Sequence, residues 1–393
     1  MERYLKCMLI LFAVAGAGNL YAQKQGQALI DSLLKALPKQ KEDTNKVNLF
    51  RDLSSAYHTI NADEGIKYGQ QELSLSLKLD WKKGTAGASN ILGVYYLEKA
   101  DFTKALEYFS TALKIFEETG NKKGVAKVTG NIGGIYAARC DFSKSLKYDF
   151  KQLKLCEEIR DTACIAVALG NIGLAYFDIS DFSKAQEYDL KALHTSEEIH
   201  DKYGVGTMTW NLGLVYEAQS KYPSAVDNFL NALKIFEEIG DKKSMASING
   251  SIGNVYDAQD DHSKAMEYFF KSLKIAEELN DKYSMANAAQ NIGNAYAQHK
   301  DYDEALKYQF RSLKLFEETE DKYGILSITM DIASVYRKQH NYIMAIEGLT
   351  RSLNMAQEVG DKHMAGLALA DMGSSYLELA RDTTLLSHIL HKG

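Results

Sequence analysis

The chain has 393 residues, of which 46% are hydrophobic and 25% charged, so it can bury a core and is not a disordered chain. Its formal net charge of -6 argues against a nucleic-acid partner, because a protein that binds nucleic acid needs a basic stripe to displace phosphate counterions. Pro38 and Pro223 are its only prolines. Proline removes a backbone donor and clashes with the preceding turn, so this scarcity favours an all-α protein.

Residues 1–22 have the features of a secretory signal peptide. Arg3 and Lys6 precede an apolar run at 7–17 that is too short to span a bilayer. Small residues follow, and cleavage is expected after Leu20-Tyr21-Ala22, before Gln23, although Leu20 is larger than the preferred residue. The alternative is a buried N-terminal helix. Residues 23–45 are expected to form an N-terminal helical segment. We expect a mature chain that is periplasmic or secreted, without stable membrane insertion after cleavage.

Export implies an oxidising compartment, in which cysteines often pair. Cys156 and Cys164 stand on either side of one predicted inter-helix turn. A disulfide between them is possible, but the sequence alone cannot give the distance between their Cα atoms.

The strongest signal is a period of 40 residues between about 46 and 380. A glycine or, once, an alanine recurs at this spacing, and a tyrosine follows each one three residues later. The columns are Gly93, Gly133, Gly173, Gly213, Gly253, Gly293, Ala333 and Gly373, and Tyr96, Tyr136, Tyr176, Tyr216, Tyr256, Tyr296, Tyr336 and Tyr376. Such a period predicts a solenoid, here of about eight helix pairs and a final incomplete one, followed by a tail at 381–393.

Each period contains two amphipathic segments, for example 124–138 and 101–116, whose apolar residues recur every three or four positions. Gly120 and Gly240 are expected to end helices in the left-handed conformation, and Asp101 and its equivalents to cap the second helix of each pair. A mid-helix glycine costs about 1 kcal/mol relative to alanine. We therefore expect the glycine column to allow close helix approach, opposite the small residues twelve positions later, such as Ala105.

Ile132-Gly133, Tyr136 and Ser145 resemble the Leu-Gly, Tyr and Ala positions of the tetratricopeptide repeat, and the match recurs over roughly residues 46 to 380. The family's opening Trp is replaced by Thr129 and its closing Pro by Glu117. The period of 40 is similar to that of the kinesin light chain and Asn-Leu-Gly-Asn spindle-adaptor arrays. The resemblance implies an all-α, right-handed superhelical solenoid of antiparallel helix pairs.

The resemblance also implies a groove lined by the first helix of each pair, in which asparagines grip an extended peptide. Carried over by column, the peptide-binding asparagines are Asn131, Asn171, Asn211 and Asn291, two residues before the glycine, and Asn254 and Asn294, one residue after it. An amide offers both a donor and an acceptor to a peptide backbone. The alternative is that these asparagines bond neighbouring helices inside the array.

The middle repeats place apolar residues on the same predicted groove: Leu174, Phe177, Trp210 and Leu214. Trp210 stands out, because Gly130, Gly170, Gly250 and Gln290 occupy the equivalent place. It is either an aromatic anchor for a partner or a residue that fills a gap between helices.

No catalytic centre, metal site or cofactor site is predicted. His194 and His200 are six residues apart and lie on different faces of a helix. The Glu-Glu pairs that begin at 117, 157, 197, 237, 277 and 317 recur too often to be a catalytic pair.

Two functions therefore compete. The first is an exported module, a scaffold or sensor, that binds a protein or peptide partner. The second is a truncated sensory ectodomain of a membrane signalling protein such as a histidine kinase, a cyclase or a transcriptional regulator, because the last repeat ends without a second helix.

Overall fold

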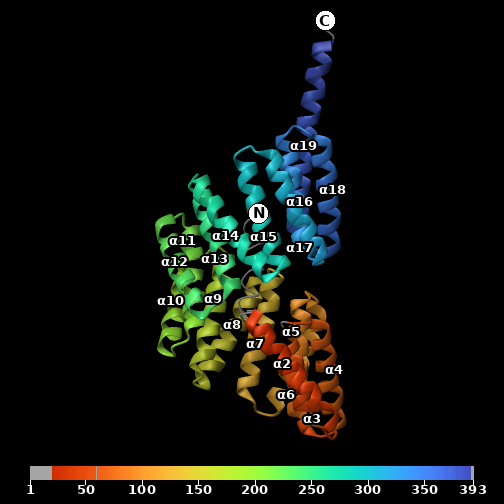
Figure 1. Ribbon diagram of the computed structural model, residues 1–393, viewed down its shortest axis with the longest axis vertical. Helices are drawn as coiled ribbons and strands as arrows, with labels where there is room; N and C mark the ends of the chain where they lie inside the picture. The colour runs from red at the N-terminus through yellow and green to blue at the C-terminus, as the bar shows by residue number, and fades with distance from the viewer. Residues whose placement is uncertain (1–19, 59, 391–393) are drawn as a thin grey trace. The chain divides into compact units, whose positions relative to one another are not determined.

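The computed structural model describes residues 20–58 and 60–390 (Figure 1). Most of the predicted signal peptide lies outside these ranges. The described residues form α-helices and one short 3-10 helix and contain no strand, which confirms the predicted fold class. None of the described helices is long and apolar enough to cross a membrane. The chain divides into two compact units, and the division along the sequence falls between Lys242 and Lys243.

The first unit contains an N-terminal helix and five helix pairs. Its elements are α2 (Leu20–Ala36), η2 (Leu37–Lys39), α3 (Thr44–Tyr57), α4 (Ala62–Lys78), α5 (Lys82–Glu98), α6 (Phe102–Glu118), α7 (Lys122–Ala138), α8 (Phe142–Glu158), α9 (Thr162–Asp178), α10 (Phe182–Glu198), α11 (Lys202–Ala218) and α12 (Tyr222–Ile239).

The second unit contains three helix pairs and one further helix. Its elements are α13 (Lys242–Ala258), α14 (His262–Leu279), α15 (Lys282–Gln298), α16 (Tyr302–Glu318), α17 (Lys322–Lys338), α18 (Tyr342–Val359) and α19 (Lys362–Leu390). In the first unit each α-helix packs against the next one along the chain, and the same is true from α14 onward in the second unit. Helices α13 and α14 approach each other at Gly253 and Phe269. Helix α19 continues past residue 380, so the predicted boundary between array and tail is not a helix end.

The turns explain why the period is so regular. Every twentieth residue from Asp80 to Gly360 has a positive φ and ends a helix in the left-handed conformation. The prediction is confirmed for Gly120 and Gly240, with φ of 66° and 79°. Most of the other turns use residues such as Ala100, for which the left-handed conformation is less favourable than it is for glycine.

The predicted caps are also present. The Asp101 side chain accepts a hydrogen bond from the backbone N–H of Lys104, and equivalent aspartates do the same at α8, α10, α14 and α16. Asn121 caps α7 through the N–H of Gly124. These bonds satisfy amide groups that a helix start would otherwise leave unpaired.

The glycine column does permit close approach, but mainly to a different residue from the one predicted. A Cβ at Gly93 would lie 2.6 Å from the Phe109 ring, sixteen positions later on the second helix. The predicted partner, twelve positions later, contributes its backbone: the Ala305 carbonyl oxygen lies 3.1 Å from a Cβ built at Gly293.

The single exception in this column is compensated in the structure. Where Ala333 replaces glycine, the facing second helix carries Gly348, and a Cβ built at Gly348 would lie 3.2 Å from the Ala333 Cβ. The pairs of the first unit and the other pairs of the second carry Tyr or Asn at that place on the second helix, for example Tyr148. The side chain missing at Gly348 therefore leaves room for the methyl group of Ala333.

The position sixteen residues after the glycine is a core position. Phe109, Phe229 and Phe269 are at most 1% exposed there. Two repeats of the first unit carry aspartate instead, and Asp149 and Asp189 are each 2% exposed. At this position, therefore, the core of the first unit holds a carboxyl group in two of its helix pairs.

Cys156 near the end of α8 and Cys164 in the first turn of α9 form a disulfide, with their Cα atoms 5.5 Å apart. The pairing that the sequence left open is therefore made. It joins two successive helix pairs across one turn.

Candidate functional site

The first helices of successive pairs contact one another: α3 with α5, α5 with α7, α7 with α9 and α9 with α11 in the first unit, and α15 with α17 in the second. We call the surface that these first helices share the inner face of each unit. It contains the positions of Asn131 and Gly134 and their equivalents 40 residues apart. All the predicted peptide-binding residues lie on first helices.

In the first unit two of the three predicted asparagines are bonded within the array. The Asn131 amide donates to Asn90 Oδ1 at 3.2 Å, which joins α7 to α5, and the Asn171 amide lies 3.4 Å from Gln152 Oε1 on α8. Asn211 is 7% exposed, and its side chain makes no hydrogen bond within the described residues. Asn131 and Asn171 therefore form hydrogen bonds to neighbouring helices inside the array.

In the second unit the pattern is reversed. Asn254 on α13 and Asn291 on α15 are half-buried, and neither side chain is hydrogen-bonded to another described residue. Asn294, one turn after Asn291, is exposed and bonded on both sides: it donates to Asp331 Oδ2 at 3.1 Å and accepts from Gln309 Nε2 at 2.9 Å. The alternative of bonds inside the array is thus realised at Asn131, Asn171 and Asn294, whereas peptide binding by Asn254 and Asn291 stays a prediction.

Asp331 on α17 is the centre of this polar network. Gln290 Nε2 donates to Asp331 Oδ2 at 2.7 Å and lies 3.2 Å from Ser327 Oγ. Burial raises the pKa of Asp331, and the hydrogen bonds from Gln290 and Asn294 oppose this rise. The network fixes the amide of Asn294, while that of Asn291 stays without an internal partner.

The predicted apolar residues are packed inside the first unit. Trp210 is 6% exposed, Leu214 7% and Phe177 9%, and Leu174 is half-buried. Trp210 therefore offers little surface to a partner, as expected for a residue that fills a gap between helices. Truncating a buried tryptophan to alanine costs about 3–5 kcal/mol, so loss of binding in such a variant would not by itself identify a contact.

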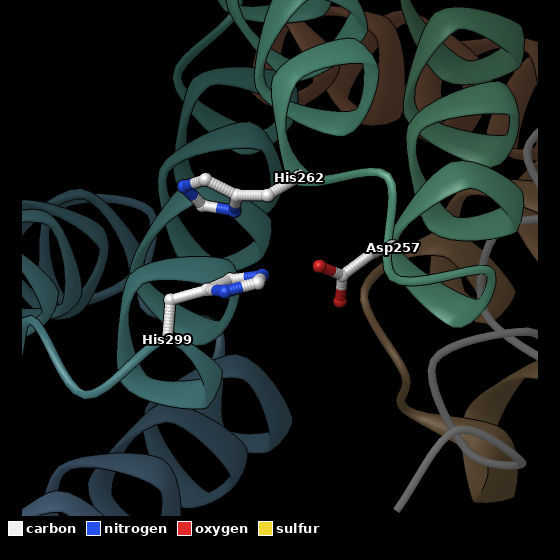
Figure 2. A group of neighbouring side chains, drawn as sticks. All are labelled: Asp257, His262 and His299. Carbon is white, nitrogen blue, oxygen red and sulfur yellow. The ribbon is translucent and has the colours of Figure 1, made fainter.

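The structure brings together one group that the sequence did not reveal. The ligand-type atoms of Asp257, His262 and His299 all lie within 4.8 Å of one another. Figure 2 shows the two imidazole rings one above the other, with the Asp257 carboxylate pointing toward them. Burial raises the pKa of Asp257, although both histidines lower it; burial and then His299 lower the pKa of His262.

A signal for this group does exist in the sequence. The position of His262 holds Phe or Tyr in the other pairs from α6 to α18, namely Phe102, Phe142, Phe182, Tyr222, Tyr302 and Tyr342. The histidine is a departure from the repeat, and its partner His299 is 37 residues away. No short motif connects the two.

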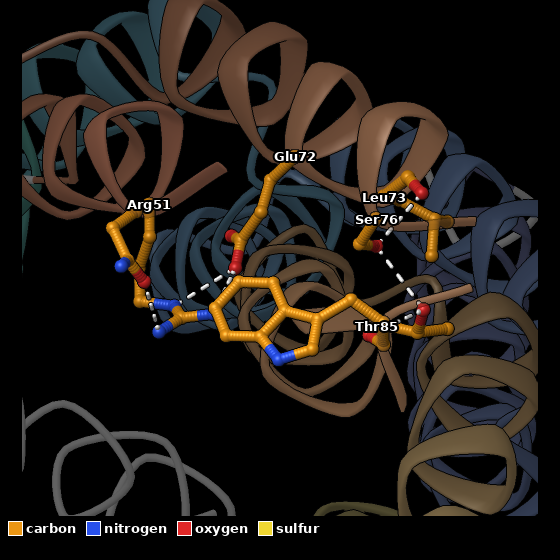
Figure 3. Close-up of polar contacts among 7 residues, drawn as sticks. Arg51, Glu72, Leu73, Ser76 and Thr85 are labelled. Atoms are coloured by element: carbon orange, nitrogen blue, oxygen red, sulfur yellow. Dashed lines mark hydrogen bonds and ion pairs between the residues drawn. The ribbon is translucent and has the colours of Figure 1, made fainter. Parts of the chain in front are cut away.

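The sequence also did not single out Arg51, which stands in the Asn131 column two repeats earlier. Its Nε and Nη2 atoms donate to Glu72 Oε1 at 2.8 and 2.6 Å, and the Glu72 side chain is fully buried (Figure 3). Burial raises the pKa of Glu72 to about 7, against the opposing effect of Arg51. This pair joins α3 to α4 at the N-terminal end of the inner face.

The recurring Glu-Glu pairs have structural partners. In four hairpins the second glutamate is paired with a lysine 36 residues earlier at the start of the first helix: Lys82–Glu118, Lys122–Glu158, Lys202–Glu238 and Lys282–Glu318. Arg311 and Arg351 pair with the first glutamates Glu277 and Glu317. The exposed His194 is paired with Glu198. Each exposed pair contributes about 0–1 kcal/mol to the stability of the fold.

Helix pairs that repeat along the chain, with their first helices on one shared face, are typical of an α-helical repeat protein. Residues 204–278 and 245–318 match the family model described as tetratricopeptide repeat. Residues 204–318 are therefore tetratricopeptide repeats, as the resemblance predicted. No curated protein sequence gives a significant match to it.

Several solved structures share the fold at low identity. A Rap protein complexed with competence and sporulation factor is 15% identical, with a TM-score of 0.58 over 86% of this chain and 99% of that one. Aspartyl phosphate phosphatase F from Bacillus subtilis is 15% identical, with a TM-score of 0.59 over 89% and 98%. The Rap conjugation gene regulator of the plasmid pLS20, in complex with the Phr* peptide, is 15% identical, with a TM-score of 0.59 over 88% and 97%.

Proposed function

We propose that this chain is a protein-interaction module that binds an extended polypeptide segment along the inner face, as a scaffold or sensor. The observation that carries the proposal is the pair Asn254 and Asn291 in the second unit. Both amides are half-buried on first helices and have no hydrogen-bond partner in the part of the chain that the structure describes.

Two physical arguments support this function. Asparagine is a poor helix former, so two asparagines in the middle of helices lower the stability of the protein, and no internal hydrogen bond offsets this loss. An amide can pair with both the N–H and the C=O of a peptide backbone, whatever the peptide sequence. The two Rap proteins named above share the fold and were solved with a competence and sporulation factor and with a peptide.

The test begins with a library of random linear peptides displayed to the purified full chain. A selected peptide is then labelled, and its Kd is measured by fluorescence anisotropy. Asn254→Ala and Asn291→Ala should each weaken binding about 2- to 10-fold, because one net hydrogen bond is worth about 0.5–1.5 kcal/mol. The double variant should lose about the product of the two factors.

Asn354→Ala is the matched control, because Asn354 is an exposed asparagine on the second helix α18. It should leave the Kd unchanged. Alanine is a better helix former than asparagine, so none of these variants should unfold the chain. Failure to select any linear peptide, or equal binding by the double variant and the control, would refute the proposal.

We also propose that the chain has no catalytic activity of its own. The recurring glutamates that could suggest acid-base chemistry are paired with lysine or arginine in the hairpins described above. Removing one such pair, with Glu118→Gln, should change stability by at most about 1 kcal/mol and leave peptide binding unaffected. A loss of binding in this variant would argue against a purely structural role.

We propose that the protein works after export. The disulfide between Cys156 and Cys164 supports this, because such bonds persist in oxidising compartments. The N-terminal sequence pattern supports it as well. Expression of the full chain in a bacterium, followed by N-terminal sequencing of the periplasmic fraction, should give a mature protein that begins at Gln23. A protein that stays in the cytoplasm with Met1 intact would contradict the proposal.

A further inference from the structure

We propose that Asp257, His262 and His299 form a binding site for one divalent transition-metal ion, with Zn²⁺ as its natural occupant. The three side chains come from three successive helices: the last turn of α13, the first residue of α14 and the residue that follows α15. Their ligand atoms lie within 4.8 Å of one another, and the two imidazole centroids are 3.8 Å apart (Figure 2).

Two atoms of this group are buried without a hydrogen-bond partner among the described residues: Asp257 Oδ1 and His262 Nδ1. A buried polar atom without a partner is unfavourable, because it has lost its bonds to water and gained none in return. Coordination of a cation would satisfy the carboxylate oxygen and the ring nitrogen together, because both are metal-ligand atoms.

A comparison with the first unit shows what this position holds without ligand-type residues. Phe177 and Phe182 stand two repeats before Asp257 and His262, and their rings pack with centroids 5.6 Å apart. At the equivalent of His299 the same repeat series has Gln219, Gln259 and Gln339. The second unit thus has an aspartate and two histidines where this repeat of the first unit has an aromatic contact and a glutamine.

The ligand set indicates the class of metal. Two imidazole nitrogens and one carboxylate oxygen suit Zn²⁺ and neighbouring divalent ions, whereas Mg²⁺ and Ca²⁺ prefer oxygen ligands alone. Nitrogen and oxygen atoms bound to one tetrahedral Zn²⁺ lie about 3.4 Å apart, given bonds of about 2.0–2.1 Å. The group must therefore contract slightly, which rotations of side chains at the helix ends allow. His299 is exposed, so a fourth ligand can be water.

The metal would link α13, α14 and α15, and so tie one helix pair to the next. This role does not depend on peptide binding. It predicts that the metal raises the unfolding temperature of the protein, because a ligand that binds only the folded state stabilises it.

The test uses the purified full chain, first dialysed against a chelator. Titration with Co²⁺, followed by visible absorption, reports binding directly, and competition with a chromophoric chelator gives the Zn²⁺ affinity. We expect one saturable high-affinity site and a higher unfolding temperature with Zn²⁺. His262→Phe and His299→Gln place the residues that other repeats use at these positions, so both variants should keep the fold by far-UV circular dichroism.

Each variant should lower the Zn²⁺ affinity at least about 100-fold, since even the loss of a residue that only supports a ligand costs 10- to 100-fold. His194→Gln is the control: it removes an exposed histidine paired with Glu198 and should bind Zn²⁺ like the parent. The proposal is overturned if the parent chain shows no saturable site, if the two ligand variants bind as tightly as the parent, or if His194→Gln removes the binding.

Discussion

Replacing Asp149 tests how strongly a buried carboxyl group lowers the stability of the first unit when it ionises. Its side chain is 2% exposed, Ser145 Oγ donates to its Oδ2 at 3.0 Å, and Oδ1 has no partner. Burial raises its pKa from 3.8 to about 7, and the bond from Ser145 opposes the rise only in part. Asp149→Asn keeps the shape and an acceptor for Ser145 but removes the charge.

The magnitude follows from linkage. A change of one in pKa is worth about 1.4 kcal/mol, so an ionised Asp149 costs the folded state about 4 kcal/mol relative to the unfolded chain. Because the folded pKa is raised, the folded state binds the proton more tightly. The stability contributed by protonation is fully present below 3.8 and is lost as the pH rises through about 7.

The variant should therefore be more stable than the parent by up to about 4 kcal/mol at pH 8 and by only about 1 kcal/mol at pH 4.5. Urea denaturation at both pH values, followed by far-UV circular dichroism, measures the two differences. Asp227→Asn, at an exposed position on α12, is the control and should change little at either pH. An equal effect of Asp149→Asn at both pH values, or no stabilisation at pH 8, would refute the reasoning.

Two further predictions concern packing and the disulfide. Gly253→Ala should destabilise the protein by about 1–3 kcal/mol in thermal unfolding, because the added Cβ would lie 2.5 Å from the buried Phe269 ring. Gly373→Ala is the control: no described atom lies within 4 Å of its Cβ, so it should stabilise the protein by up to about 1 kcal/mol, and effects of the same sign would contradict the packing argument. Reduction of the disulfide between Cys156 and Cys164 should lower the free energy of unfolding by about 2–3 kcal/mol, as expected for a loop of this separation, and a double serine variant should no longer respond to reductant.

The sequence by itself determined the helices and their register. Apolar residues at helical spacing, Asp caps such as Asp101 and the 40-residue columns depend on contacts within one helix or one hairpin, and these are local in the chain. The same signals predicted the number of helix pairs. They missed most of the left-handed turns, because residues such as Ala100 and Cys140 take that conformation without the glycine that marks Gly120.

Only the tertiary structure decided the state of the individual polar groups. Asn131 and Asn291 occupy the same column, yet one is bonded to a neighbouring helix and the other is not. The difference comes from Asn90, a residue 41 positions away whose side chain reaches Asn131. Contacts between neighbouring pairs join residues about 37 to 41 apart, and which atoms meet depends on how the helices pack.

The group formed by Asp257, His262 and His299 has the same origin. Each residue alone is an ordinary surface or core substitution in one repeat, and the sequence gives no spacing that marks a metal site. Stacking of successive helix pairs brings the end of one helix against the start of another, so that three residues from α13, α14 and α15 meet. The repeat fixed where such junctions occur, and three-dimensional packing decided that this one could bind a cation.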